Sequence, residues 1–236
     1  MSVRKSFMSL RIAAVVAAIT AGTILWHAPL FGAEEPVVIA PPVVDNPKSA
    51  GPAQTAVLAG GCFWGVQGVF EHVRGVKKVI AGYTGGDGRS AHYEMVSTGT
   101  TGHAESVEIT FDPAAISYGQ ILQIAFSVVE DPTQLNRQGP DYGTQYRSAI
   151  FYANEDQKRI AEGYIKQLDQ SHEFKRPIVT RVDRLTGFFP AEAYHQDYLI
   201  HNPTQPYIAF NDLPKIENLR RTFPELYSGT PVLARN

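Results

Sequence analysis

The chain of 236 residues contains one cysteine, Cys62, and this count constrains the possible folds more than any other feature. A lone cysteine forms no disulfide within the chain, and it supplies too few ligands for a cysteine-rich zinc site or an iron–sulfur cluster. Stability must therefore come from a hydrophobic core. The content of 44% hydrophobic and 11% aromatic residues is typical of a globular protein with such a core.

The charge balance excludes two classes of partner. The chain has 21 Lys and Arg residues against 23 Asp and Glu residues, which gives a net charge of −2. This balance provides neither the basic stripe that nucleic acid requires nor a polybasic surface for anionic lipid. We therefore expect no nucleic-acid partner.

Residues 1–33 are predicted to be a targeting segment. A basic start precedes the uncharged apolar run Ile12–Leu25, which is short for a membrane span and typical of a secretory signal peptide. The small residues Gly32 and Ala33 predict cleavage before Glu34, and an uncleaved N-terminal anchor is the alternative. Either outcome predicts an exported, periplasmic protein, which is soluble after cleavage or tethered to the inner membrane.

Residues 34–55 are predicted to be an extended linker, because their many prolines exclude a helix or a central strand. The rest of the chain is long enough for one domain. Its mixed order of strands and helices predicts an α/β (α+β) two-layer sandwich, a mixed sheet with helices packed on it. The predicted strands span residues 56–59, 76–83, 104–111, 148–152 and 177–182. The predicted helices span residues 62–73, 118–129, 155–168 and about 213–221.

Cys62 follows Gly60 and Gly61 at the predicted start of a helix. A helix N-terminus carries unpaired N–H groups and a partial positive charge, so this position is expected to stabilise a thiolate. An ordinary buried cysteine is the alternative. However, an unpaired cysteine in an exported protein is an oxidation liability that Ser or Ala would avoid. We therefore expect Cys62 to be a reactive thiol.

Glu105 lies in the alternating segment 104–111, on the same face as Val107 and Ile109. If this apolar face meets the core, burial raises the pKa of the Glu105 carboxyl. A carboxylic acid that stays protonated near neutral pH can donate a proton in catalysis. The pattern fits a second environment equally well. In it, Glu105 lies at the solvent end of the strand or beside a Lys or Arg.

Two further features carry less information. The polar, turn-rich segment 131–147 is long enough to be a functional loop that presents hydrogen-bonding groups, or a loop that satisfies its own backbone. The seven histidines include no pair at helical metal-binding spacing with an evident third ligand. We therefore expect no metal site.

Taken together, the motifs of the chain resemble those of the methionine sulfoxide reductase A family over about residues 56–200. They occur in the family's order, and together they are specific. The motifs are Gly61-Cys62-Phe63-Trp64-Gly65, Thr101-Gly102-His103-Ala104-Glu105, Gly143-Thr144-Gln145-Tyr146-Arg147 and Tyr194-His195-Gln196-Asp197-Tyr198.

The resemblance implies a two-layer α/β sandwich with residues 56–228 as the catalytic domain. It implies reduction of the S epimer of methionine sulfoxide, free or in oxidised proteins, to methionine, and hence a role in protein repair under oxidative stress. By resemblance, Cys62 is the nucleophile and Glu105 is the proton donor to the sulfoxide oxygen.

The resemblance also assigns residues that bind the substrate. Tyr93 and Tyr146 hydrogen-bond the sulfoxide oxygen, and Asp141 helps to hold the site. Phe63 and Trp64 form an apolar pocket for the S-methyl group of the substrate.

Many members of this family carry further cysteines near the C-terminus that convert the sulfenic acid into an internal disulfide, but this chain has none after Cys62. The resemblance therefore implies that a sulfenic acid forms on Cys62 and that an external thiol regenerates the enzyme. The expected reductant is a thioredoxin-like protein or a small thiol. No bound cofactor is expected, and we expect a monomer.

Two other functions fit parts of the pattern. A cysteine peptidase or acyltransferase would use Cys62 with a downstream histidine, although the residues before Cys62 do not match the papain-like signature. Such an enzyme has no use for Glu105, so Glu105→Gln would be harmless. A non-catalytic exported binding module would bind its ligand equally well after Cys62→Ser.

Overall fold

The computed structural model describes residues 35–234. They belong to one compact unit. The targeting segment predicted for residues 1–33 lies outside the described residues. Within residues 35–234, no helix has both the length and the apolar character that a membrane span needs.

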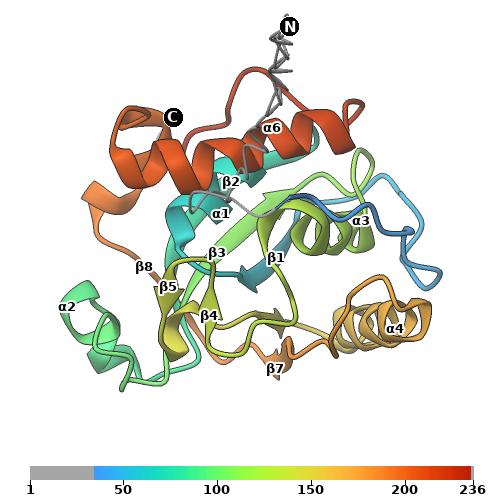
Figure 1. Ribbon diagram of the computed structural model, residues 1–236. Coiled ribbons are helices and arrows are strands. Elements are labelled where there is room, and N and C mark those ends of the chain that lie inside the picture. The colour runs from blue at the N-terminus through green and yellow to red at the C-terminus, as the bar shows by residue number, and fades with distance from the viewer. Residues whose placement is uncertain (1–34, 235–236) are drawn as a thin grey trace, which may run out of the picture. The chain divides into compact units, whose positions relative to one another are not determined.

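Six strands form one mixed sheet in the order β7-β6-β1-β3-β2-β8 (Figure 1). Every neighbouring pair is antiparallel except β6 and β7, which are parallel. A separate two-stranded ladder joins β4 to β5. The strands are β1 (Gln54–Ala59), β2 (Val76–Thr84), β3 (Ala104–Phe111), β4 (Arg137–Gln138), β5 (Asp141–Tyr142), β6 (Ala149–Tyr152), β7 (Arg181–Arg184) and β8 (Phe188–Pro190).

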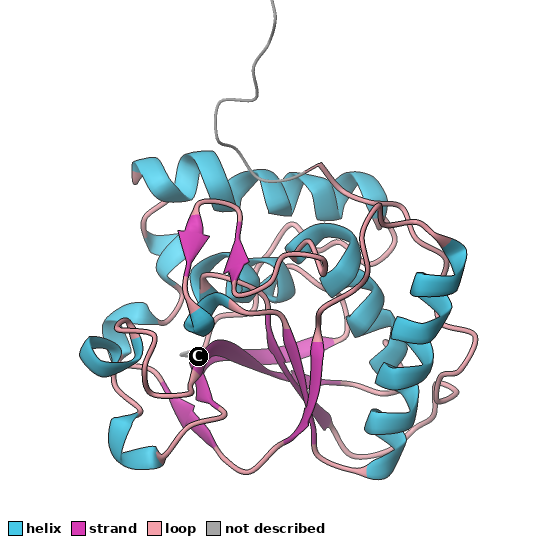
Figure 2. Cartoon of the chain, turned by 60° about the horizontal axis from the view of Figure 1, so that its bottom comes forward, coloured by secondary structure: helices cyan, strands magenta, loops and turns pink. Residues whose placement is uncertain are grey.

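Helices pack on this sheet (Figure 2). They bury its apolar side chains in one large core, to which α1, α3, α4 and α6 all contribute. A second, smaller apolar cluster contains side chains of β1, β3 and β6. The helices are α1 (Phe63–Glu71), α2 (Tyr93–Val96), α3 (Tyr118–Ile124), α4 (Glu155–Ser171), α5 (Tyr198–His201) and α6 (Leu213–Thr222). The predicted fold class, an α/β sandwich with helices packed on a mixed sheet, is confirmed.

Local signals explain where several elements begin and end. The Ser117 side chain accepts a hydrogen bond from the Gln120 N–H and caps α3. The predicted helix 118–129 then continues from α3 into the π-helical turn η2 (Ala125–Val129). The predicted strand 177–182 begins later, at Arg181, because the Val179 N–H donates to a loop carbonyl instead of a strand.

The Pro-rich segment before β1 contains no helix or strand between residues 35 and 53, and it lies along the helices of the domain. The Val37 N–H donates to the Ser127 carbonyl at 2.9 Å, and the Tyr164 hydroxyl of α4 donates to the Ala40 carbonyl at 2.8 Å. These contacts fix the segment against η2 and α4.

Candidate active site

The turn between β1 and α1 places Cys62 directly before the first residue of the helix. Gly61 makes this turn possible because its φ is +95°, a conformation that other residues adopt only with strain. A Cβ at Gly61 would also approach the Gln138 side chain to 2.8 Å. Cys62 is only 9% exposed, so the turn carries its thiol into a nearly buried position.

Burial changes the expected chemistry of Cys62. The pKa of its thiol is raised well above the ordinary value, first by burial and then by the nearby Glu105 and Asp212 carboxyl groups. A hydrogen bond from the Trp64 N–H lowers the pKa but does not compensate. Burial therefore opposes the thiolate that the helix N-terminus is expected to stabilise.

Glu105 lies inside the protein, at 2% exposure, and faces the first turn of α1. Its Oε2 accepts a hydrogen bond from the Phe63 N–H at 3.1 Å. Burial raises the pKa of the carboxyl to about 8, although the Phe63 hydrogen bond opposes this. Of the two environments that the sequence left open, Glu105 occupies the buried one, and it is mainly a neutral acid at pH 7.

The hydrogen bond to Glu105 also determines where its proton lies. Because Oε2 accepts from Phe63, the acidic hydrogen belongs on Oε1. Among the described residues, Oε1 has no hydrogen-bond partner within the protein. The acid therefore offers a donor to a ligand that binds beside Cys62.

Aromatic rings form one side of the site. Trp64 stacks on Tyr198 with a centroid distance of 3.9 Å, and its Nε1–H donates to His195 Nδ1 at 3.1 Å. His195 in turn lies 5.0 Å from the Phe63 ring and 4.6 Å from the Tyr93 ring. These contacts bring Phe63, Trp64 and Tyr93 together around one imidazole.

The remaining predicted residues come from the 131–147 loop. Tyr146 is half-buried, and burial, Glu105 and Cys62 raise the pKa of its hydroxyl, which stays protonated and able to donate. Asp141 accepts a hydrogen bond from the Tyr207 hydroxyl at 2.5 Å. Burial raises the pKa of Asp141, in opposition to that hydrogen bond. Cys62 and Asp141 line the same pocket, Glu105 accepts from the residue after Cys62, and the charges of Cys62 and Glu105 act on the Tyr146 hydroxyl, so the four residues belong to one site.

Three residues of the site were not assigned from the sequence. His195 orients Trp64, and burial lowers the pKa of its imidazole, which keeps the ring neutral. Tyr207 lies edge-on to Trp64 at 6.2 Å and hydrogen-bonds Asp141. Asp212 is fully buried against the first turn of α1, where a Cβ on Gly65 would meet its Oδ1. Tyr207 and Asp212 lie in a tail without a recognisable motif, and only the fold brings them to Cys62.

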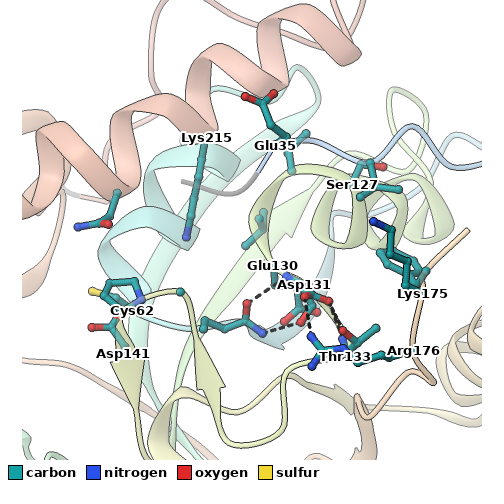
Figure 3. Close-up of a pocket in the computed structure, with 18 of the residues that line it drawn as sticks. Glu35, Cys62, Ser127, Glu130, Asp131, Thr133, Asp141, Lys175, Arg176 and Lys215 are labelled. Atoms are coloured by element: carbon teal, nitrogen blue, oxygen red, sulfur yellow. Dashed lines mark hydrogen bonds and ion pairs between the residues drawn. The ribbon is translucent and has the colours of Figure 1, made fainter. Parts of the chain in front are cut away.

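A groove of about 330 Å³ extends away from Cys62, between α6, the end of η2 and the residues after α4 (Figure 3). Cys62, Asp141, Tyr207 and Lys215 line one end, and Lys175 and Arg176 line the other. Residues 35–234 contain no group of three or more His, Cys, Asp or Glu side chains that is arranged to hold a metal ion.

The fold and the site define a class of enzyme. A single nearly buried cysteine faces a protonated carboxylic acid, phenol hydroxyls and an apolar wall of aromatic rings. This set suits a thiol-based reductase whose substrate has a polarised oxygen that must accept a proton.

Comparison with known proteins identifies the family. Residues 54–226 match the profile of peptide methionine sulfoxide reductase. The chain is 61% identical over 186 residues to peptide methionine sulfoxide reductase MsrA 2 of Mesorhizobium japonicum, which covers 79% of this chain and 95% of the relative. It is 52% identical over 191 residues to peptide methionine sulfoxide reductase MsrA 2 of Synechocystis sp., and this match covers 80% of this chain and 89% of the relative.

Solved structures agree with this relationship. Methionine sulfoxide reductase A of Corynebacterium diphtheriae superimposes with a TM-score of 0.56 at 31% identity, covering 75% of this chain and 89% of that one. Mxr1 of Saccharomyces cerevisiae in its reduced form gives a TM-score of 0.59 at 28% identity, covering 69% of this chain and 92% of that one. The chain belongs to the peptide methionine sulfoxide reductase family, the enzymes that reduce the S epimer of methionine sulfoxide to methionine.

Proposed function

We propose that this enzyme works through a one-cysteine cycle in which Cys62 attacks the sulfoxide sulfur and Glu105 protonates the sulfoxide oxygen. One observation carries the proposal. The Glu105 carboxyl is protonated and oriented by the Phe63 N–H, with its free oxygen available beside the only thiol of the chain. A sulfoxide is a poor electrophile until its oxygen accepts a proton, so a neutral acid serves this reaction better than a carboxylate.

The substrate is proposed to sit between the acid and the aromatic rings. Its S-methyl group packs against Phe63 and Trp64, whose planes are held by His195. Its oxygen accepts hydrogen bonds from the Tyr93 and Tyr146 hydroxyls and from Glu105. The raised pKa of both phenols supports this arrangement, because each phenol remains a donor throughout the neutral range.

The proton balance follows from the neutral resting state. Glu105 gives its proton to the sulfoxide oxygen, and the Cys62 thiol returns a proton to Glu105 as its sulfur attacks the substrate sulfur. The oxygen is then transferred, methionine leaves and Cys62 becomes a sulfenic acid. Asp141 acts through Tyr207, which it holds against Trp64.

Regeneration is proposed to require an external thiol, because the chain has no second cysteine. The reductant is a thioredoxin-like protein or a small thiol, and two thiol groups are consumed for each methionine formed. We further propose that the enzyme is a monomer acting on oxidised exported proteins, after cleavage of residues 1–33 or while tethered by them. The basic start and short apolar run of that segment support export.

The geometry of His195 argues against the peptidase alternative. Its Nδ1 accepts from the Trp64 indole and its Nε2 lies 3.9 Å from Glu192, so neither nitrogen is engaged with Cys62. A thiol peptidase needs that contact to form its thiolate–imidazolium pair.

The test uses the full chain with dithiothreitol and a peptide that contains racemic methionine sulfoxide, and follows methionine by chromatography. We expect consumption to stop at about half of the substrate, because only one epimer reacts, and to be absent in Cys62→Ser. Consumption of both epimers, or activity in the variant, would overturn the proposal.

A further inference from the structure

We propose that the groove beside Cys62 binds the polypeptide on one side of an oxidised methionine, and that it selects segments with a basic residue near that methionine. The Pro-rich residues 35–53, which we call the strap, form one wall of this groove. The inference rests on the reductase function proposed above and deepens it by naming the class of polypeptide that the enzyme takes.

The groove is continuous with the reacting sulfur. Cys62 lines it, and Figure 3 shows Lys175 and Arg176 at the opposite end from Cys62. A methionine sulfoxide side chain whose sulfur contacts Cys62 occupies only the first of these ends. The volume of about 330 Å³ is in the range of pockets that enclose a whole small ligand, so the rest of the groove has room for residues that flank the oxidised methionine. Free methionine sulfoxide makes no use of this part.

The strap contributes Val37 to the lining of the groove. The Val37 N–H donates to the Ser127 carbonyl at 2.9 Å, and Ser127 lines the groove as well. Two residues further on, Ile39 is buried in the core, and its carbonyl accepts a hydrogen bond from the Gln123 side chain at 2.9 Å. Val37 is thus held at the groove as a fixed apolar wall, whereas its neighbour Val38 is 77% exposed.

A second set of contacts fixes the strap further along. The Asp45 side chain accepts hydrogen bonds from the Ser117 hydroxyl at 2.5 Å and from the Gly119 N–H at 2.9 Å, both at the start of α3. A Cβ at Gly119 would approach Pro42 and Asp45 to 2.5 Å, so glycine permits this close contact. The strap is therefore part of the folded domain, although it precedes the residues that match the family profile.

The lining of the groove contains more acidic than basic side chains. Five are acidic and three are basic: Glu35, Glu130, Asp131, Asp141 and Glu173 against Lys175, Arg176 and Lys215. The strap supplies one of the acidic groups, Glu35, which forms an ion pair at 3.6 Å with Arg221 outside the groove.

Most of the basic groups are neutralised within the protein. Arg176 forms an ion pair with Asp131 at 3.6 Å. Lys215 forms one with the buried Asp212 at 3.7 Å. Lys175 has no ion pair among the described residues. The acidic excess therefore persists, and it favours a ligand with a basic side chain over one with an acidic side chain.

Residues 173–175 give the far end of the groove an apolar surface between two opposite charges. Phe174 is half-buried and packs against the core, so the aliphatic stem of a Lys or Arg side chain can lie on it. Glu173 and Lys175 are exposed, and Glu173 also has no ion pair among the described residues. Glu173 attracts the cationic head of such a side chain and Lys175 repels it, so the two residues have effects of opposite sign.

The experiment measures kcat/KM of the full-length enzyme with dithiothreitol for the S epimer of free methionine sulfoxide and for a set of peptides. Each peptide has one methionine sulfoxide among glycines, and Lys, Gln or Glu at one of the three positions before or after it. For at least one position, we expect the Lys peptide to exceed the matching Glu peptide about tenfold. In about 0.5 M NaCl this ratio should fall to about twofold, because salt screens exposed charges.

Three charge variants test the far end of the groove. Glu173→Gln should lower the Lys-to-Glu ratio about threefold, because it removes the attracting carboxylate. Lys175→Met should raise the ratio about threefold, because it removes the opposing ammonium. Glu162→Gln, which removes an exposed charge of α4, is the matched control and should leave the ratio unchanged.

A valine pair tests the strap. Val37→Ala should lower kcat/KM about threefold more for the peptides than for free methionine sulfoxide, because it removes apolar contact with the flanking residues. Val38→Ala changes the exposed neighbour and is the matched control, so it should affect both kinds of substrate equally little.

Three outcomes would overturn the inference. One is equal kcat/KM for Lys and Glu peptides at every position. A second is a change of the same sign, or no change, in the Lys-to-Glu ratio for Glu173→Gln and Lys175→Met. The third is an effect of Val37→Ala that is as large for free methionine sulfoxide as for the peptides, which would make Val37 a structural residue. If wild type reduces neither kind of substrate, the proposed function itself fails, and this result is distinct from all three.

Discussion

The role of Glu105 as the acid can be tested by Glu105→Gln. The amide has the shape of the carboxyl, and its carbonyl oxygen can still accept the Phe63 N–H, so the substitution removes the proton and little else. With a pKa of about 8, about nine-tenths of Glu105 is protonated at pH 7, whereas at the ordinary value of 4.5 only about 0.3% would be. Burial therefore enriches the acid roughly 300-fold. We expect the variant to release methionine about 10²–10⁴ times more slowly.

The pH dependence of the same comparison gives a sharper test. The protonated form is the working form, so its contribution is present at low pH and is lost as pH rises through about 8. Below about pH 8 Glu105 carries no charge, so the ionisation of Cys62 is the same in both proteins and cancels in the ratio of wild-type to variant rates; above it, the Glu105 carboxylate also raises the pKa of Cys62 in wild type alone, which acts in the same direction as the loss of the acid. This ratio should be constant up to about pH 7 and should fall about tenfold per pH unit above pH 8.

The assay is a rapid-quench single turnover with enzyme in excess over substrate and no reductant, with methionine measured by chromatography. This design excludes regeneration from the measured rate. A variant rate close to wild type would refute the role assigned to Glu105. A ratio that stays constant from pH 6 to pH 10 would show that Glu105 acts without transferring a proton.

Three further variants test the surrounding network. Trp64→Phe loses the hydrogen bond to His195 and should raise KM about tenfold with a smaller change in kcat, measured by steady-state kinetics. Tyr146→Phe should slow single-turnover methionine release about tenfold by removing one donor to the oxygen, and an unchanged rate would remove Tyr146 from the oxygen site. Burial, together with the nearby Asp197 carboxyl group, raises the pKa of Glu71 to about 9, so its stability contribution is greatest below about pH 4.5 and is lost as pH rises towards 9. Between pH 6 and pH 8, the free energy of unfolding of Glu71→Gln, measured by urea denaturation, should therefore exceed that of wild type by about 1–3 kcal/mol. An excess that does not depend on pH would contradict the assignment.

Elements with strong local patterns were predictable from the sequence. The alternation in residues 104–111 predicts β3 with its observed bounds, Ala104–Phe111. The glycine pair before Cys62 predicts the turn that opens α1, because only glycine tolerates the backbone of Gly61. By contrast, β8 has three residues, which is too short for a hydrophobic period, and it was not predicted.

The parts of the site that were not predicted depend on contacts between distant segments. Tyr207 meets Asp141 across 66 positions, and His195 meets Trp64 across 131. No local period encodes such pairs. The ionisation of Cys62 has a related limit: the helix start is visible in the sequence, whereas the burial that raises the pKa of the thiol exists only in the folded domain.

The central claim is that Cys62 alone performs the reductive step, and the most direct measurement is the stoichiometry of a reaction without reductant. Excess racemic methionine-sulfoxide peptide is added to the enzyme, and methionine and the modified residue are quantified together by chromatography and mass spectrometry. The account predicts one methionine per protein, all from the S epimer, with one dimedone adduct at Cys62. No methionine, turnover beyond one equivalent, or an adduct-free Cys62 after methionine release would contradict it.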